Sequence, residues 1–198
     1  NLTFDVALKQ AQELGFAEAD PTFDIEGIDA AHKITILSSI AFGIPLNFNS
    51  VYVEGISEIN QKDIIYAEEL GYRIKLLAIT KFHNDSIELR VHPTLIPEKR
   101  LVANVNGSMN AVLIQGNMVG PTLYYGAGAG SEPTASAVVA DIIDIARNID
   151  LQKVSHVPIL GFIDDEIKDK KILAIEEIAC EFYLRLTMEN QSGGLAKI

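Results

Sequence analysis

The chain has 198 residues, of which 48% are hydrophobic and 22% charged, a balance that predicts a folded globular protein with a substantial core. Its formal net charge of −11 disfavours binding to nucleic acid or to an anionic membrane surface, since both are polyanions. The single cysteine, Cys180, excludes an internal disulfide and a cysteine zinc site, and it is consistent with a reducing, cytoplasmic setting. No apolar run is long enough to span a membrane.

The first seventy residues have a helical pattern of apolar positions. Helices are predicted over residues 4–14, 28–42 and 62–70. Each is followed by a glycine that can end it, namely Gly15, Gly43 and Gly71. The second helix is almost entirely apolar after Lys33, so we expect most of its circumference to be buried.

The pattern then changes to alternation, which predicts antiparallel strands. These strands cover residues 72–82, 87–92, 111–115 and 118 onward. We expect a turn at 83–86 and a hairpin turn at Gly116-Asn117, because both of the latter residues tolerate a positive φ. Pro133 is expected to open a long helix that ends near Ile149.

These elements predict an α+β fold in which a mixed or antiparallel sheet is covered by helices. We expect one domain over residues 1–152, an irregular connector over 153–179, and the start of a second module over 180–198. The charged runs at 164–166 and 168–171 are interpreted as a solvated part of the connector.

The stretch from Gly15 to Lys33 is the most informative part of the sequence. It carries five carboxylates, namely Glu18, Asp20, Asp24, Glu26 and Asp29. Asp29 and Lys33 are four residues apart and share one face of a helix, so an ordinary surface ion pair is one interpretation. The other is a functional lysine at the edge of a buried helix, with the carboxylates ahead of it forming a negative pocket for a substrate ammonium.

Three glycines, Gly126, Gly128 and Gly130, precede the long helix. Their spacing is G-x-G-x-G, whereas a dinucleotide-binding βαβ unit has G-x-G-x-x-G after a strand. A flexible connection is therefore one interpretation, and a loop that lets backbone approach a ligand is the other.

The histidines predict no metal site. His32 points about 100° away from Lys33 on a helix and is expected to pack or to lie on the surface. His83, His92 and His156 are scattered without the spacing of metal ligands.

Two motifs resemble the homoserine dehydrogenase family. The first is an alanine, three residues, a glycine and then a D-P-x-x-D-x-x-G-x-D-x-x-x-K run, matched by Ala11, Gly15, Asp20, Pro21, Asp24, Gly27, Asp29 and Lys33. The second is Y-G-x-G-A-G-x-x-P-T-A-S-A-V, matched by residues 125–138. Phe16 and Ala127 depart from the family, which often has tyrosine and arginine at these two places.

The resemblance implies NAD(P)-dependent interconversion of L-homoserine and L-aspartate 4-semialdehyde. It implies Lys33 as the catalytic lysine, a general acid or electrostatic stabiliser, with Asp29 binding substrate and placing that lysine. It further implies that Glu18 holds the substrate ammonium. Asp24 is implied as another substrate-site residue, hydrogen bonded to Lys33 or to an ordered water.

The cofactor implied by the resemblance is NADP or NAD. The family binds it mainly through an N-terminal Rossmann domain, which we expect to lie outside this sequence, so the 198 residues alone are expected to be inactive. Gly126, Gly128 and Gly130 are expected on the cofactor side of the cleft.

The last residues resemble the beginning of a ferredoxin-like ACT domain, in which a strand is followed by D/N-x-x-G-x-L and a helix. Asn190, Gly193 and Leu195 match, whereas Ser192 replaces the usual proline. The resemblance implies threonine as a possible feedback effector and a homodimer or tetramer. Two alternatives remain: an ordinary strand–helix connection in place of the ACT domain, and a nonenzymatic amino-acid-binding or oligomerisation module in place of the enzyme.

Overall fold

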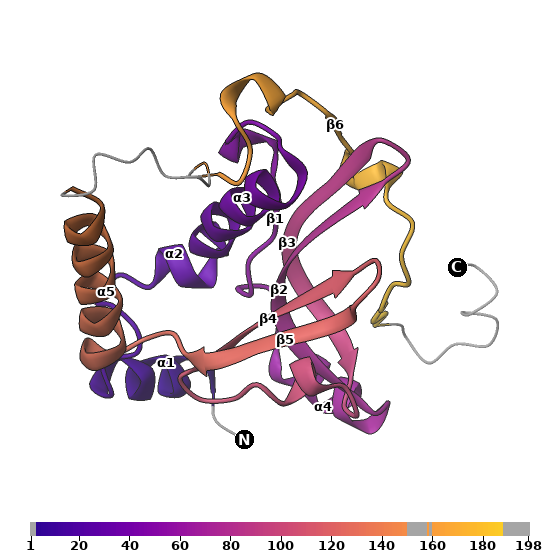
Figure 1. Ribbon diagram of the computed structural model, residues 1–198. Coiled ribbons are helices and arrows are strands. Elements are labelled where there is room, and N and C mark those ends of the chain that lie inside the picture. The colour runs from indigo at the N-terminus through magenta and orange to yellow at the C-terminus, as the bar shows by residue number, and fades with distance from the viewer. Residues whose placement is uncertain (1–2, 150–157, 159, 188–198) are drawn as a thin grey trace.

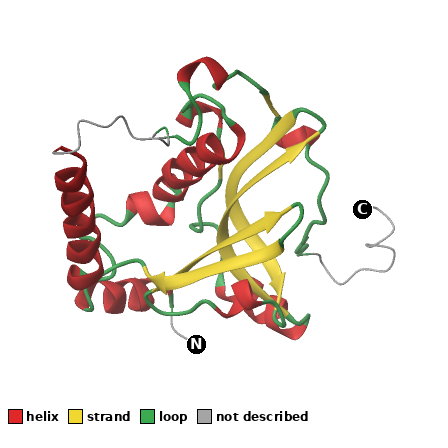
Figure 2. Ribbon diagram, in the orientation of Figure 1, coloured by secondary structure: helices red, strands yellow, loops and turns green. Residues whose placement is uncertain are grey.

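A computed structural model describes residues 3–149, 158 and 160–187 of the protein (Figure 1). Helices lie beside two sheets, so the predicted α+β class with a mixed sheet is confirmed (Figure 2). Within the described ranges, no helix is long and apolar enough to cross a lipid bilayer.

The described residues form five α-helices, four of them where the sequence predicted helices and one short addition. They are α1 (Phe4–Glu13), α2 (Thr22–Ile25), α3 (Ile28–Phe42), α4 (Gln61–Glu69) and α5 (Ser131–Ile149). Helix α2 was not predicted, because its four residues are too few to show a period. Helix α5 begins two residues before Pro133, which therefore lies inside the first turn, where its missing N–H has no intrahelical partner.

The main sheet is built on a long hairpin, and two short strands pair with its second strand, one at the start and one near the middle. Its strands are β1 (Tyr52–Val53), β2 (Tyr72–His83), β3 (Ser86–Pro97) and β6 (Lys171–Ile172). Strand β3 is antiparallel to β2 and parallel to both β1 and β6. Asn84 and Asp85 form the predicted turn with φ of 46° and 61°, a pair of positive φ values that matches the twist of a two-residue hairpin.

Strand β3 continues five residues beyond the predicted end at His92, through two prolines. The carbonyls of Ile87 and Val91 accept hydrogen bonds from the backbone N–H groups of Leu173 and Glu54. The backbone N–H and C=O groups of odd-numbered residues in β3 therefore point away from β2. Pro93 and Pro97 share this parity. Their missing N–H groups therefore lie on the outer edge, where the ladder with β2 does not need them.

The second sheet is a two-stranded hairpin of β4 (Met109–Gly116) and β5 (Gly120–Ala127). The predicted two-residue turn at Gly116-Asn117 is wrong, because Gly116 pairs with Gly120 and three residues lie between them. Gly120 carries the positive φ, 74°, which allows the longer turn to close.

The core lies between α3 and one face of the hairpin β2–β3. Its buried members are Ala31, Ile34, Ile44, Ile87, Leu89 and Val91. The buried face of α3 also includes Thr35, Ser38 and Ser39, whereas Ile36, Leu37 and Ile40 on the other face are 39–44% exposed. The prediction that most of the circumference of α3 is buried is therefore wrong for the described residues, because the sheet covers one side only.

The segment expected to be a solvated connector returns to the sheet instead. Strand β6 pairs with β3 at Ser86 and Ile87. Lys170 lies over the ring of Phe82, 5.0 Å from its centroid, and pairs with Asp85 at 3.3 Å. This charged run is therefore held against the hairpin.

Residues 181–187 contact α4 and form no ladder with a described strand, although a strand was predicted here. Arg185 donates from Nε to Asp63 Oδ1 at 2.6 Å, and the Tyr183 hydroxyl donates to the same oxygen at 3.1 Å. The Asn60 N–H donates to Asp63 Oδ2 at 3.1 Å and completes a capping box. The ACT-like residues Asn190, Ser192, Gly193 and Leu195 lie outside the described residues.

Helix α5 and the β4–β5 hairpin expose many large apolar side chains. Helix α5 stands apart from both sheets (Figure 1). The exposed residues include Val112, Leu113, Ile114, Tyr124, Tyr125, Val138, Val139, Ile142, Ile143 and Ile145. Apolar surface on this scale is typical of a face that binds another part of a protein.

Replacing Asp63 by asparagine should lower the free energy of unfolding at neutral pH by about 2 kcal/mol, because an amide turns one acceptor into a donor that faces other donors. Burial alone would raise the pKa of the Asp63 carboxyl, but hydrogen bonds from Arg185, Asn60 and Tyr183 outweigh it and hold the pKa below its ordinary 3.8. The stabilisation is therefore present at neutral pH and is lost as the pH falls below about 4.

Chemical denaturation followed by circular dichroism at neutral and acidic pH measures this difference. The control is Glu69→Gln, an exposed carboxylate at the other end of α4, which should change stability by less than about 0.5 kcal/mol. Equal effects of the two substitutions would contradict the role of Asp63.

Candidate functional site

The acidic segment takes its shape from a tight junction between α2 and α3 at Gly27. Gly27 has φ of +75°, and a Cβ added there would lie 2.9 Å from Val91 Cγ1 in the core. Both constraints favour glycine. The junction starts α3 at Ile28, so Asp29 falls in the first helical turn, where a carboxylate is stabilised by the helix dipole.

Lys33 follows Asp29 by one turn and pairs with it. Lys33 Nζ lies 2.6 Å from Asp29 Oδ2, and the two side chains are 70% and 42% exposed. The expectation that Lys33 enters a buried element is wrong in this structure, because it lies on the uncovered face of α3. The ion pair itself was predicted from the spacing of four residues.

Two of the five carboxylates in this segment hold the backbone in place. Asp20 Oδ1 accepts from the Thr22 hydroxyl at 2.6 Å and from the Thr22 N–H at 3.1 Å, and these bonds lower the pKa of the Asp20 carboxyl. Glu26 Oε1 accepts from the hydroxyl of Ser57. Asp20 and Glu26 are therefore structural.

Glu18 and Asp24 remain available. Both are exposed, and within the described part of the chain no hydrogen bond or ion pair reaches either carboxylate, including any bond from Lys33 to Asp24. The backbone around Glu18 is fixed, because Gln12 Nε2 donates to the Glu18 carbonyl at 2.9 Å. Sequence reasoning missed Gln12 and Ser57, since no local pattern marks a side chain that bonds to a distant segment.

The three glycines of the loop before α5 differ in their surroundings. Gly126 pairs with Asn110 in the hairpin and has open space where a side chain would be. A Cβ at Gly128 would collide with the side chain of Asn110, and Gly130 has φ of +111°. Among the described residues, no hydrogen bond or ion pair joins this loop to the acidic segment.

His32 packs as expected from its direction on α3. Its ring centroid lies 4.7 Å from that of Phe48 and 6.1 Å from that of Phe23. Within the described ranges no group of histidine, cysteine, aspartate and glutamate side chains is placed to hold a metal ion.

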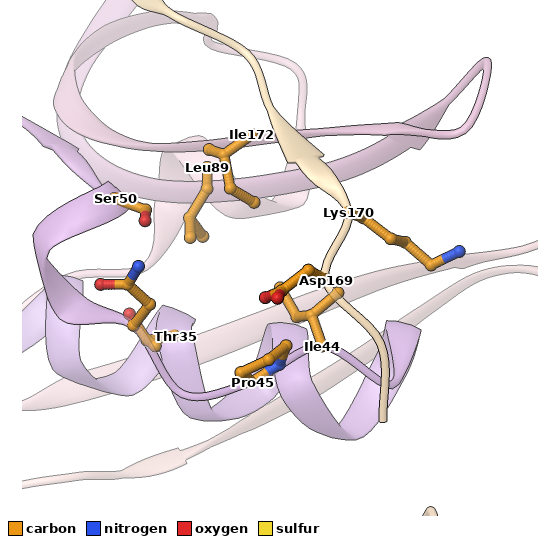
Figure 3. A pocket seen from close by; sticks show the side chains of 9 residues that line it. Thr35, Ile44, Pro45, Ser50, Leu89, Asp169, Lys170 and Ile172 are labelled. Carbon is orange, nitrogen blue, oxygen red and sulfur yellow. The ribbon is translucent and has the colours of Figure 1, made fainter. Parts of the chain in front are cut away.

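A hollow of about 110 Å³ lies beside the buried face of α3 (Figure 3). Leu89 and Ile172 point into it, and the carboxylate of Asp169 faces it, whereas Lys170 points away. Thr35, on the buried face of α3, forms part of the wall of the hollow. This hollow contains none of the predicted site residues.

Comparison with known proteins gives one consistent family. The family model described as homoserine dehydrogenase matches residues 1–143. A homoserine dehydrogenase of Neisseria gonorrhoeae is 59% identical over 195 residues, which cover 98% of this chain and 45% of that protein. One of Pseudomonas aeruginosa is 56% identical over 196 residues, with 99% and 45% covered.

Solved structures agree with this result. The crystal structure of a homoserine dehydrogenase from Thiobacillus denitrificans is 64% identical, with a TM-score of 0.81 over 89% of this chain and 41% of that one. A hyperthermophilic archaeal homoserine dehydrogenase in complex with NADPH is 30% identical, with a TM-score of 0.56 over 75% of this chain and 41% of that one. The chain thus spans less than half the length of the relatives it matches.

Because the Asp29–Lys33 pair is exposed, replacing Lys33 by methionine should change the free energy of unfolding by less than about 0.5 kcal/mol. Its neighbour Ile34 is 7% exposed in the core, so Ile34→Ala should destabilise the protein by about 2 to 5 kcal/mol. Thermal or chemical denaturation of both variants measures the contrast, and a large loss in Lys33→Met would show that the lysine is structural.

Proposed function

Since the chain belongs to the homoserine dehydrogenase family, we propose that it carries the substrate-binding and catalytic residues of an NAD(P)-dependent homoserine dehydrogenase. That enzyme interconverts L-homoserine and L-aspartate 4-semialdehyde, a reaction in the biosynthesis of threonine, methionine and isoleucine. A nonenzymatic amino-acid-binding or oligomerisation module is not favoured, because the family match covers residues 1–143.

The observation that carries the proposal is that the acidic residues of this segment fall into two groups, one bonded within the fold and one exposed. Asp20 and Glu26 are engaged in bonds that shape the backbone, whereas Glu18, Asp24 and the Asp29–Lys33 pair are exposed. The same segment thus offers unpaired carboxylates and an accessible lysine, which its local structure does not require. The arrangement suits a small substrate that carries both an ammonium group and a reacting oxygen.

Each free group has a chemical role in this reaction. Reduction of an aldehyde builds negative charge on its oxygen, and Lys33 supplies a nearby cation and a proton. Asp29 Oδ2, 2.6 Å from Lys33 Nζ, orients the ammonium of the lysine. Glu18 is assigned to the substrate ammonium, a charge-assisted contact, and Asp24 is assigned to the same substrate site.

The glycine-rich loop is suited to line the cofactor side of the cleft. The nicotinamide cofactor supplies or accepts the hydride when bound. Gly126 leaves open space for backbone to approach a ligand, and the first turn of α5 offers N–H groups from Ser131 and Glu132. We assign Gly126, Gly128 and Gly130 to this side of the cleft. The described residues contain no βαβ dinucleotide-binding unit, so the proposal places most of the contacts with NADP or NAD in a domain outside this chain.

The proposal extends to assembly and regulation. Residues 1–152 are assigned to the catalytic domain, 153–179 to a connector and 180–198 to the start of an ACT domain, with threonine as a possible effector. The apolar surface of α5 and of the β4–β5 hairpin supports burial in a homodimer or tetramer. The sole cysteine, Cys180, is free and exposed, which supports a cytoplasmic location.

In the full-length enzyme, Lys33→Ala should lower turnover by about 10²- to 10⁴-fold, because it removes the proton donor and the cation together. Asp29→Asn should have a smaller effect, about tenfold, since the lysine remains but is less well placed. The assay follows oxidation of homoserine by cofactor absorbance.

The matched control for this series is Lys9→Ala, an exposed lysine on α1, which should leave turnover unchanged. Near-normal turnover in Lys33→Ala would remove Lys33 from the mechanism.

Glu18→Gln should raise the KM for homoserine by about 10- to 100-fold, because an uncharged amide replaces a charge-assisted contact with the substrate ammonium. The KM for the cofactor should change by less than about twofold, since that ligand does not use this carboxylate. Glu13→Gln at the end of α1 is the control. Equal increases in both KM values would contradict the assignment of Glu18.

A further inference from the structure

The side chain of Asn110 occupies the place that a side chain at position 128 would need. Asn110 stands opposite Gly126 in the β4–β5 ladder. A Cβ built on Gly128 would lie 2.1 Å from Asn110 Nδ2 and 2.7 Å from its Cγ. The carboxamide therefore lies directly on the glycine-rich loop, and a side chain at position 128 would have to displace it.

A shared acceptor fixes both groups at this contact. The Gly128 N–H donates to the Ser108 carbonyl at 3.3 Å, and Asn110 Nδ2 lies 3.4 Å from the same oxygen. Asn110 thus packs against the loop and shares a hydrogen-bond acceptor, the Ser108 carbonyl, with Gly128.

The base of this contact is tied to the main sheet. Lys75 on β2 donates from Nζ to the Val105 carbonyl at 2.6 Å and to Asn106 Oδ1 at 3.1 Å, just before β4 begins. Lys75 therefore anchors the entry to the hairpin. The hairpin in turn delivers Asn110 to the loop.

We propose that Asn110 is a positioning residue that sets the shape of the glycine-rich loop for the nicotinamide cofactor. The inference rests on the proposed function, since it takes this loop as the cofactor side of the cleft. Backbone that approaches a ligand closely must be held in one conformation, because the apparent dissociation constant rises as the inverse of the fraction of time the loop spends in the binding conformation. Asn110 supplies that restraint without contacting the reacting atoms.

The test uses the full-length enzyme and measures binding of NADPH by its fluorescence together with the KM for homoserine. Asn110→Ala should raise the NADPH dissociation constant about tenfold, while the KM for homoserine changes less than about twofold. Asn110→Asp, which keeps the shape of the side chain but cannot donate to the Ser108 carbonyl, should also weaken NADPH binding. The control is Asn117→Ala in the turn at the opposite end of the hairpin, which should bind NADPH as the wild type does.

A double variant that adds side-chain volume at position 128 and removes it at position 110 sharpens the test. Gly128→Ala should weaken NADPH binding by its collision with Asn110, and Asn110→Gly in the same protein should restore part of the affinity by removing that collision. Thermal midpoints of all variants show whether each one folds.

Unchanged NADPH affinity in Asn110→Ala, or losses that simply add in the double variant, would overturn the proposal. A parallel increase in the NADPH dissociation constant and in the KM for homoserine would do the same, because it indicates general damage to the protein. A wild-type enzyme that binds NADPH but does not oxidise homoserine would instead overturn the proposed function.

Discussion

Gly27 lies so close to Val91 that even a methyl group on it would be 2.9 Å from the valine Cγ1. Val91 is fully buried in β3, and β3 pairs with every other strand of the main sheet. The place where α3 begins is therefore fixed by the strand with the most buried residues in the described part of the chain. Since Asp29 and Lys33 follow on that helix within two turns, a buried contact in the core determines where the exposed ion pair stands.

Much of this architecture could be predicted because its signals are local. The periods of α1, α3 and α4 and the positive-φ turn at Asn84-Asp85 depend on residues that are neighbours in sequence. Strands β1 and β6 could not be predicted, because each has only two residues and acquires its structure from β3. The same reasoning explains α3, whose sequence shows an apolar helix but not which side the sheet covers.

The candidate site divides in the same way. A spacing of four residues predicts the contact of Asp29 with Lys33, since helix geometry alone brings them together. Which carboxylates remain free could not be predicted, because Glu26 is engaged by Ser57, 31 residues further along the chain. The role of Gln12 beside Glu18 likewise depends on how a loop folds back on a helix.

The hairpin β2–β3 also has a consequence for the order of folding. Its strands pair in register along their whole length, and its turn needs only two residues, so the loop to be closed is very short. Strand β6, by contrast, joins across a large separation, since Lys170 beside it lies 85 residues after its partner Asp85. We therefore expect the hairpin to form early and the C-terminal segment to join last, so that amide hydrogens of β3 facing β2 exchange more slowly than those facing β6. The segment that carries Tyr183 and Arg185 would then be the first to detach during unfolding, leaving Lys33 on an intact helix.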